Sequence, residues 1–568
     1  TTYGCESGGD PVNIPDLSYE EFLDFHRQYY HPSNSFIYLY GNMDMEEKLE
    51  FIDSHYLSAF DSLAIDSQIR DQEAFAQVKD IQKNYPVSED EGEEDNTYLS
   101  YNMVVGQAKD INLSLAFEVL DYALLSAPGA PLKQALLDAK IGKDIYGSFE
   151  DGIKQTYFSI VAKGANLSQK EEFVKVIRDT LTKIAEEGID KKAVKAGINY
   201  YEFRFREADF SSYPKGLMYG LDILSSWLYD DEKPFCEVQL LEGFEFLKKA
   251  AEEGYFEELI RKYLLDNAHG SILSLVPERG LAAKRDQELE KRLENYRSSL
   301  SDEELIRMVE RTKALEAYQE SEENPEALTC IPMLSREDIK KEITGFTNEE
   351  HFVDDSLFLY HDVCTNGIGY ADLLFEIHNF DTDTVHYLGL LKSVLGAVDT
   401  ENYSYGELFN EVNARTGGIA YGIEVYDSAT DTDAFRAMFA VRGKALYPEM
   451  DFMFSMIREV LTTSKLTDTK RLYEIVAQVK SRLQMYLTGS GHSAAAVRAM
   501  AEFSDSSWVT DQIRGIAFYG LIEQLEKHFE EKKDQIVENL KLVMQYVLRP
   551  ENLIVSCTSE TDGLEAVK

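Results

Sequence analysis

The sequence predicts an α+β protein in which a domain of one kind, an antiparallel sheet packed with helices, occurs at least twice. Strand-like and helix-like segments alternate along the chain, and segments of the two halves match each other at a nearly constant spacing. The 568 residues are 44% hydrophobic, and a chain of this length divides into several cores. We therefore expect layered sheet-and-helix domains.

The charge is strongly negative. The formal net charge is -45, from 102 acidic and 57 basic residues. Such a surface repels phosphate backbones within a Debye length, so nucleic acid is not an expected partner. A cleft lined by the same field would concentrate cationic ligands such as basic peptides, although acidity can also serve solubility alone.

The cysteines and the apolar runs bear on the compartment. The five cysteines are widely scattered, with no Cys-x-x-Cys pair, and predict a reducing compartment without disulfides or a structural zinc site. They are Cys5, Cys236, Cys330, Cys364 and Cys557. No run of 18 apolar residues is present, so no membrane span is expected. The start at Thr1, without Met, suggests a processed or truncated chain.

The first segment has the pattern of a helix, a strand and a second helix. Ser18 and Glu21 form a capping-box pattern, aromatic residues follow on one helical face, and Pro32 ends the helix. The apolar run 36–40 predicts a buried strand, and residues 45–56 predict a helix. We expect this segment to be the end of a larger domain.

The next segment begins a new domain. The acidic block 88–96 predicts a solvated loop. Apolar residues alternate over 99–105, as in a half-buried strand, and recur with helical spacing over 113–124.

An internal repeat is the strongest signal in the sequence. Four short matches occur in the same order, and their offset drifts from 275 to 281 residues, as a few loop insertions would cause. The matching strings are Ala139–Gly142 with Ala414–Gly417, Lys163–Gly164 with Arg442–Gly443, Ile177–Arg178 with Ile457–Arg458, and Ser225–Trp227 with Ser506–Trp508. Two homologous domains follow from this order.

A charged segment lies between the repeats. Residues 281–318 are rich in Glu, Lys, Arg and Leu, and Ser301 with Glu304 predicts a helix start in their middle. Pro325 and the polar residues before it end the second helix. We expect a helical hairpin that acts as a spacer or hinge.

The histidines do not form a metal-binding pattern. The sequence has no His-Glu-x-x-His and no His-x-x-Glu-His, so no helix offers two imidazoles and a carboxylate to one zinc ion. His26 and His31 would lie about 140° apart on a helix, which favours packing over metal binding. His361 and Cys364 lie in a region with strand and turn character, where a metal site is also not expected.

Other catalytic patterns are also absent. Residues 489–492, Gly-Ser-Gly-His, precede a helix start that could hold an anion, but the glycine pattern of a phosphate loop is missing and a packing turn is favoured. No Gly-x-Ser-x-Gly elbow is present. The residues alone therefore yield no catalytic, metal or substrate-binding assignment.

Several strings, in order along nearly the whole chain, resemble the presequence proteases of the pitrilysin/insulinase family of zinc peptidases. The strings are Tyr3–Gly4, Ser7–Pro11, Ile14–Pro15, Phe25–His26, Tyr29–Asn34, Tyr40–Asp44, Arg415–Ile419, Val441–Lys444 and Gly489–His492 with Ala494, Ala495 and Arg498. The resemblance implies four α+β domains in two halves, joined by a helical hairpin and closing around a chamber for unfolded peptides. It implies that residues 1–75 are the tail of the first, catalytic domain, 76–282 the second domain, 283–337 the hairpin linker and 338–568 the third domain.

The resemblance also implies a zinc-dependent endopeptidase in which a metal-activated water attacks the peptide bond. In the family the zinc ligands and the general base precede the Tyr3–Pro11 string, so none is carried over to this chain. The fourth domain would follow Lys568. We therefore expect the chain alone to bind no zinc and to lack peptidase activity. Its expected partners are cationic unfolded peptides and the missing domains, in a bacterial cytoplasm or an organellar matrix.

Two other functions remain open. The same fold serves as non-catalytic scaffold or partner subunits, and fold does not determine function. The hairpin favours the single-chain peptidase, because the scaffold relatives lack such a linker. A soluble acidic repeat protein that binds other proteins is the third hypothesis.

Overall fold

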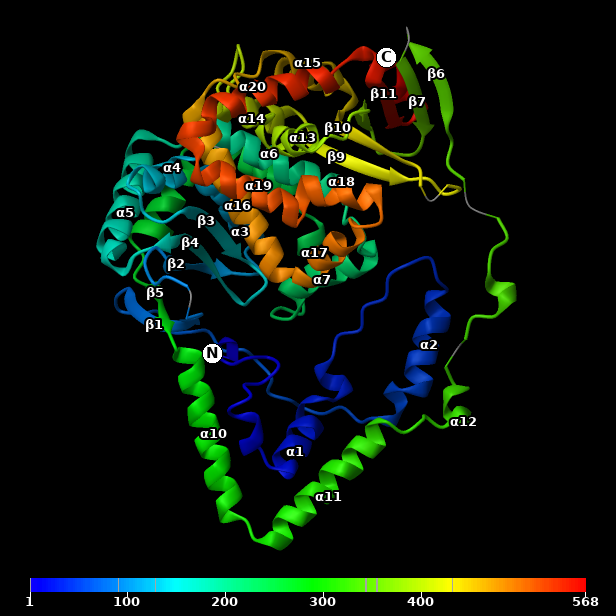
Figure 1. Ribbon diagram of the computed structural model, residues 1–568. Coiled ribbons are helices and arrows are strands. Elements are labelled where there is room, and N and C mark those ends of the chain that lie inside the picture. The colour runs from blue at the N-terminus through cyan, green and yellow to red at the C-terminus, as the bar shows by residue number, and fades with distance from the viewer. Residues whose placement is uncertain are drawn as a thin grey trace.

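The computed structural model describes residues 2–89, 91–127, 129–331, 333–342, 345–353, 356–431 and 433–567. These residues form two sheets, each covered by helices, and a linker that extends below them (Figure 1). The first sheet has five strands in the order β1-β5-β2-β4-β3. Its strands are β1 (Lys79–Val87), β2 (Thr97–Gln107), β3 (Asp144–Glu150), β4 (Gln155–Ala165) and β5 (Gly270–Arg279).

The second sheet, as far as the chain is described, has six strands in the order β6-β7-β11-β8-β10-β9. They are β6 (Glu349–Val353), β7 (Ser356–Asp362), β8 (Ile368–Ile377), β9 (Ile419–Asp427), β10 (Phe435–Leu446) and β11 (Leu553–Ser559). Without β6, the order and the directions of its strands match the first sheet. β7 runs parallel to β11 as β1 does to β5, and the other pairs are antiparallel. The predicted repeat is therefore confirmed, with one parallel pair in each sheet that the prediction missed.

The short sequence matches fit this repeat unevenly. Three pairs lie at equivalent places: where α4 and α14 lead into β3 and β9, in β4 and β10, and in α5 and α15. The tryptophan match does not, because Ser225–Trp227 closes helix α7 whereas Ser506–Trp508 lies at the start of α18. That tripeptide matches in sequence without occupying the same structural position.

Each sheet has its own hydrophobic core. In β2, Leu99, Tyr101 and Met103 are 0%, 1% and 0% exposed, so the predicted alternation places one face of the strand inside. The first core includes helices α3 (Ile111–Asp121), α4 (Pro131–Asp138), α5 (Lys170–Glu187), α6 (Lys191–Glu207), α7 (Lys215–Trp227), α8 (Leu241–Ala250) and α9 (Tyr255–Leu259) around it. The predicted helix 113–124 is α3 with a following π-helical turn, Tyr122–Ser126.

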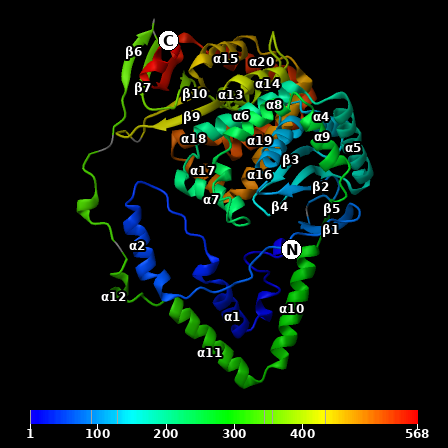
Figure 2. The ribbon, with the colours of Figure 1, turned by 180° about the vertical axis from the view of Figure 1, so that it is seen from behind.

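The second core lies between its sheet and a longer set of helices. They are α13 (Thr382–Val394), α14 (Tyr405–Arg415), α15 (Met450–Thr463), α16 (Thr469–Gly489), α17 (Gly491–Met500), α18 (Asp505–Arg514), α19 (Ile516–Lys527), α20 (Phe529–Val547) and α21 (Leu564–Val567). The two units meet where α6 packs against α14 (Figure 2). Asn199 Nδ2 donates to the carbonyl of Asn413 at 2.7 Å, and the rings of Tyr122 and Phe409 stack.

The linker contains the two predicted helices, but they do not pack as a closed hairpin. α10 (Leu281–Ser299) and α11 (Asp302–Gln319) diverge from the bend at residues 300–301, and the short α12 (Pro325–Leu328) follows (Figure 1). The predicted capping box is present: the Ser301 hydroxyl accepts from the Glu304 amide, and the Glu304 carboxylate accepts from Ser301. No described residue of α10 or α11 is buried, so neither helix has an apolar contact that would hold the two together.

The N-terminal segment has helices where the sequence predicts them, α1 (Tyr19–Tyr29) and α2 (Met45–His55), and the capping box of Ser18 is present. The predicted buried strand at 36–40 is wrong. The backbone there is not a strand, and Phe36 and Tyr40 are 38% and 52% exposed. A strand needs a neighbour for its backbone hydrogen bonds, and the described chain places none beside this run. Its aromatic side chains contact helix α7 instead.

Candidate functional site

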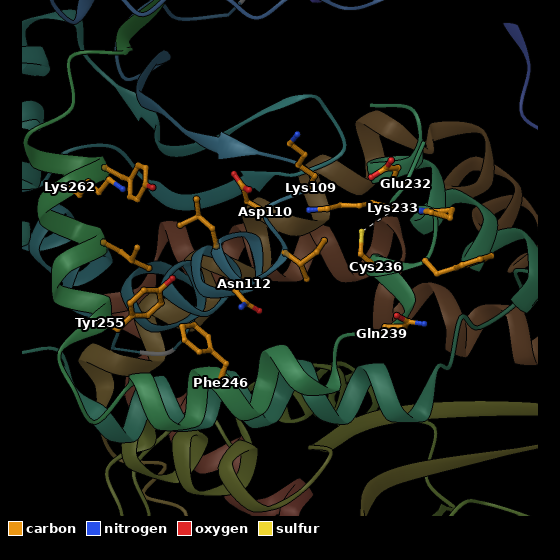
Figure 3. A pocket seen from close by; sticks show the side chains of 16 residues that line it. Lys109, Asp110, Asn112, Glu232, Lys233, Cys236, Gln239, Phe246, Tyr255 and Lys262 are labelled. Atoms are coloured by element: carbon orange, nitrogen blue, oxygen red, sulfur yellow. Dashed lines mark hydrogen bonds between the residues drawn. The ribbon is translucent and has the colours of Figure 1, made fainter. Parts of the chain in front are cut away.

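The segment 232–239, between α7 and α8, separates two cavities. The first has a volume of about 850 Å³ and lies between the start of α3, this segment, α8 and α9 (Figure 3). Charged side chains of both signs line it, together with the aromatic rings of Phe246 and Tyr255. Lys109 pairs with Asp230 at 3.6 Å, and the Cys236 thiol donates to the carbonyl of Lys233 at 3.4 Å. This wall of the cavity is therefore held by its own polar contacts.

The second cavity, of about 870 Å³, lies where three parts of the chain meet. The N-terminal run 38–40, helices α6 to α8 and residues 366–368 and 446 of the second unit surround it. Phe235 lines both cavities, so the segment 232–239 is a shared wall. The lining is rich in aromatic rings, which are Tyr38, Tyr40, Phe203, Phe205, Tyr219 and Phe235. An aromatic cavity of this size suits apolar side chains of a ligand.

One carboxylate in this second cavity is fully paired. Glu202 has a side chain only 9% exposed and contacts Arg206 at 2.6 Å and Lys248 at 2.7 Å. Two cations for one buried carboxylate satisfy its charge. Glu202 therefore fixes α6 against α8 and is not free to bind a ligand.

Four other carboxylates form what we call the acidic group: Glu118 on α3, Asp151 after β3, Asp222 on α7 and Glu237 in the wall segment. All four are half-buried. Glu237 stands between Cys236 of the first cavity and Val238 of the second, and Asp222 precedes Ile223 of the second. The acidic group thus accompanies the two cavities along their shared wall.

The charges of the acidic group act on one another. Burial raises the pKa of Glu118 to about 8, and the negative charges of Asp151 and Glu237 add to the rise. Burial also raises the pKa of Glu237 to about 8, with Asp151 and Asp222 adding to it. The pKa of Asp222 and that of Asp151 are raised by burial as well. Within the described part of the chain, none of the four has an ion-pair partner. A cationic ligand would relieve this repulsion.

Little in the sequence pointed to this group. Its members come from four separate elements, and only the fold brings them together. One signal was available, because Glu118 and Asp121 stand three residues apart in a helix that is otherwise almost entirely apolar or small. Acidic side chains on the apolar stretch of a helix are costly and therefore point to a special environment.

The residues considered for metal binding all have other contacts. His26 stacks on Tyr30, and His31 Nδ1 accepts from the amide of Ser33. His361 lies in β7, where its ring contacts the Thr347 carbonyl at 3.0 Å and the Ser556 hydroxyl at 3.1 Å, and Cys364 is exposed beyond the strand. Across the described ranges no cluster of three or more His, Cys, Asp or Glu residues could hold a metal ion.

Residues 489–492 form the turn between α16 and α17, as the packing-turn interpretation predicted. All five cysteines are unpaired. In the part of the chain that the structure describes, no helix combines the length and the apolar character that crossing a membrane requires.

Comparison with known proteins gives the class. Residues 16–201 match the family described as "Peptidase M16 inactive domain", and residues 275–525 match the family of regions associated with subfamily C of these peptidases. The chain is 38% identical to protein HypA of Clostridium perfringens over 100% of this chain and 58% of that protein. It is 32% identical to presequence protease 1, chloroplastic/mitochondrial, of Arabidopsis thaliana over 100% of this chain and 53% of the relative.

The mitochondrial presequence protease of Xenopus laevis is 24% identical over 99% of this chain and 54% of its own length. Among solved structures, pitrilysin is 13% identical, with a TM-score of 0.46 over 99% of this chain and 56% of that chain. The chain is a peptidase-family protein of the M16, or insulinase, type. Within that family it is presequence-protease-like, and it spans a little over half the length of these relatives.

Proposed function

We propose that this chain is the substrate-enclosing part of a zinc-dependent endopeptidase that degrades short unfolded peptides, and that its acidic group selects cationic ones. The acidic group carries this proposal. Four half-buried carboxylates without described cationic partners lie along the wall between two cavities. Membership of the presequence-protease-like peptidases supports a peptide as the ligand.

The physical argument concerns charge and shape together. An Arg or Lys side chain of a peptide would meet partly desolvated carboxylates, where an ion pair is stronger than on an open surface. The aromatic cavity beside them would take apolar side chains of the same peptide. An extended chain can present both kinds of side chain at once, whereas a folded protein cannot enter cavities of about 850 and 870 Å³.

The zinc chemistry is not assigned to these residues. The described ranges offer no donor set that fits a zinc ion, so no step of hydrolysis is routed through them. In this proposal the metal and the general base belong to another part of the polypeptide. The chain contributes binding and enclosure.

Peptide binding tests the proposal directly. Fluorescence anisotropy would follow a labelled, unstructured peptide rich in arginine and leucine, and a matched peptide with glutamate in place of arginine. We expect only the cationic peptide to bind. Glu118→Gln, Asp151→Asn, Asp222→Asn and Glu237→Gln combined should weaken binding about 10- to 100-fold, from roughly 0.5 kcal/mol per ion pair.

The control changes acidic residues on the outer helix α5. Asp179→Asn with Glu186→Gln removes exposed negative charge far from the cavities in the fold and should leave the affinity nearly unchanged. If this control weakens binding as much as the acidic-group variant, the net charge and not the site attracts the peptide. Equal binding of both peptides would contradict the proposal.

Turnover provides a second test. We expect the purified chain, supplied with zinc, to leave the labelled peptide uncleaved. Zinc-dependent cleavage would show that this chain holds its own catalytic centre. We place the protein in a reducing compartment, a bacterial cytoplasm or an organellar matrix, with the five unpaired cysteines in support.

The second candidate is a non-catalytic partner or scaffold subunit, which the description "Peptidase M16 inactive domain" for residues 16–201 keeps open. The coding sequence upstream of Thr1 separates the two. An intact His-x-x-Glu-His motif supports the peptidase, and a degenerate motif supports the scaffold.

A further inference from the structure

A third cavity, in the second unit, is lined by cations. It has a volume of about 450 Å³ and lies between α13, β9 and α16, with the end of α18 at its side. Lys392, Arg482 and Arg514 line it, and so do the polar side chains of Ser393 and Gln478. Three positive side chains around one small cavity are unexpected in a protein whose net charge is -45.

The negative charge beside these cations is already engaged. Glu424 is the acidic residue among those described as lining the cavity, and it accepts from Arg442 at 2.8 Å. Arg442 in turn contacts Asp372 at 3.2 Å. The Glu424 charge is therefore shared with a cation outside the lining.

The lining cations have little compensation of their own. Lys392 Nζ donates to the carbonyl of Ile513 at 3.2 Å. Neither Arg482 nor Arg514 has an ion pair with any residue that the structure describes. Burial lowers the pKa of Lys392 to about 8, and the charge of Arg514 adds to that effect. The three cations thus repel one another across a partly enclosed space.

This repulsion reaches the first unit. Lys133, on α4, has a pKa that is lowered by burial and further by the charges of Arg482 and Arg471. Arg471 itself is engaged by Glu474 at 2.9 Å and by the carbonyl of Ala397. The excess positive charge near the cavity is therefore felt at the junction of the two units.

We propose that this cavity binds a compact, multiply charged anion of the phosphate class, such as inorganic phosphate, pyrophosphate or a small phosphate ester. Two guanidinium groups provide planar pairs of donors that match phosphate oxygens, and a lysine adds a point charge. Ser393 and Gln478 can complete the hydrogen bonds. A volume of about 450 Å³ admits such an anion and excludes a folded partner. This site is separate from the acidic group and does not depend on the peptide-binding proposal.

Isothermal titration calorimetry with sodium pyrophosphate, at constant ionic strength set with chloride, tests this site. We expect saturable binding at one site per chain. Arg482→Gln and Arg514→Gln should each raise the dissociation constant at least about tenfold, because each removes a charged pair of donors. Both side chains are exposed, so these variants should fold, which circular dichroism would verify.

The matched control is Arg458→Gln on α15, an exposed arginine outside the cavity, which should bind pyrophosphate like the unaltered chain. Titration with orthophosphate, a phosphate monoester and citrate separates the possible sources. Citrate binding as tight as that of pyrophosphate would overturn the phosphate assignment. No saturable heat with any phosphate compound, or equal loss in the Arg458 variant, would overturn the site.

Discussion

The carboxylate of Glu207 accepts a hydrogen bond from Lys444 Nζ at 2.6 Å and so joins the two sheet-and-helix units. Glu207 ends helix α6 of the first unit, and Lys444 lies in β10 of the second. The hydroxyl of Tyr370, in β8, donates to the same carboxylate at 3.0 Å. Because the Glu207 side chain is only 6% exposed, this pair is largely desolvated. Its integrity should matter for how firmly the units are held together.

We predict that Lys444→Met destabilises the chain by about 3 kcal/mol, because it leaves a buried carboxylate without its cation. Urea denaturation measures the loss. Adding Glu207→Gln to this variant should recover part of it, since the unpaired charge is then removed. Lys533→Met, in a pair with Glu530 on exposed α20, serves as the control and should leave the midpoint unchanged. Equal losses at both lysines would refute a special role for the buried pair.

A second prediction concerns the contact between the N-terminal run 36–40 and helix α7. Phe36 packs on Trp227 with ring centroids 4.6 Å apart, and a Cβ at Gly220 would lie 2.9 Å from the Tyr38 ring. Gly220→Val should therefore weaken the docking of this run by roughly 1–3 kcal/mol through overpacking. Faster hydrogen exchange over 36–40 and a red shift of Trp227 emission, in a Trp508→Phe background, would report it.

The control for this change is Gly520→Val, also within a helix, where an added Cβ meets open space. It changes helix propensity in the same way without touching the run. If both variants release the run, or if neither does, the contact with α7 does not hold it.

Patterns local in sequence predicted much of this fold. The alternation in β2, the capping boxes at Ser18 and Ser301 and the order of the repeat are each encoded within a few residues, and each is present. The strand predicted at 36–40 failed for the opposite reason. An apolar run becomes a strand only beside another strand, and that neighbour is not a property of the run itself.

The candidate sites could not be predicted for a related reason. The acidic group draws on α3, the end of β3, α7 and the wall segment, and the cationic cavity draws on α13, α16 and α18. No spacing in the sequence links these residues, because tertiary packing alone brings them together. The limits of the predicted domains remain a proposal for the same reason, since packing between them decides where one ends.

A third prediction concerns Glu560, whose carboxylate accepts from the amides of Thr365, Asn366 and Gly367 at 3.0 to 3.1 Å. The hydroxyl of Tyr447 also donates to it. The hydrogen bond from Tyr447, followed by those from the Gly367 and Thr365 amides, lowers the pKa of Glu560 from 4.5 to about 2. This carboxylate therefore fastens the turn between β7 and β8 to the end of β11.

A lowered folded-state pKa means that the unfolded chain binds the proton more tightly. The contribution of Glu560 to stability is thus fully present above about pH 4.5 and is lost as the pH falls toward about 2. We predict that Glu560→Gln lowers the thermal midpoint at neutral pH, and that its difference from the unaltered chain narrows in acid. Glu565→Gln, an exposed neighbour, is the control. A constant difference across this pH range would contradict the assigned cause.

The acidic group leads to the opposite pH dependence. The folded-state pKa of Glu118 and that of Glu237 are each raised from 4.5 to about 8, so between these values the folded chain holds protons that the unfolded chain has released. By linkage, stability should decline as the pH rises from about 4.5 to about 8. Glu118→Gln with Glu237→Gln should remove much of that decline in thermal unfolding.

Binding of the arginine-rich peptide should change in the other direction, because it needs the ionised carboxylates while arginine stays charged throughout. Below pH 8, affinity should rise by up to about tenfold per pH unit for each carboxylate that must lose its proton. Calorimetry in buffers of different ionisation enthalpy should detect the protons released on binding. In the double variant the rise should be much smaller and fewer protons should be released. An affinity that is independent of pH between about 6 and 9 would show that the peptide does not contact Glu118 and Glu237, since contact requires their ionisation.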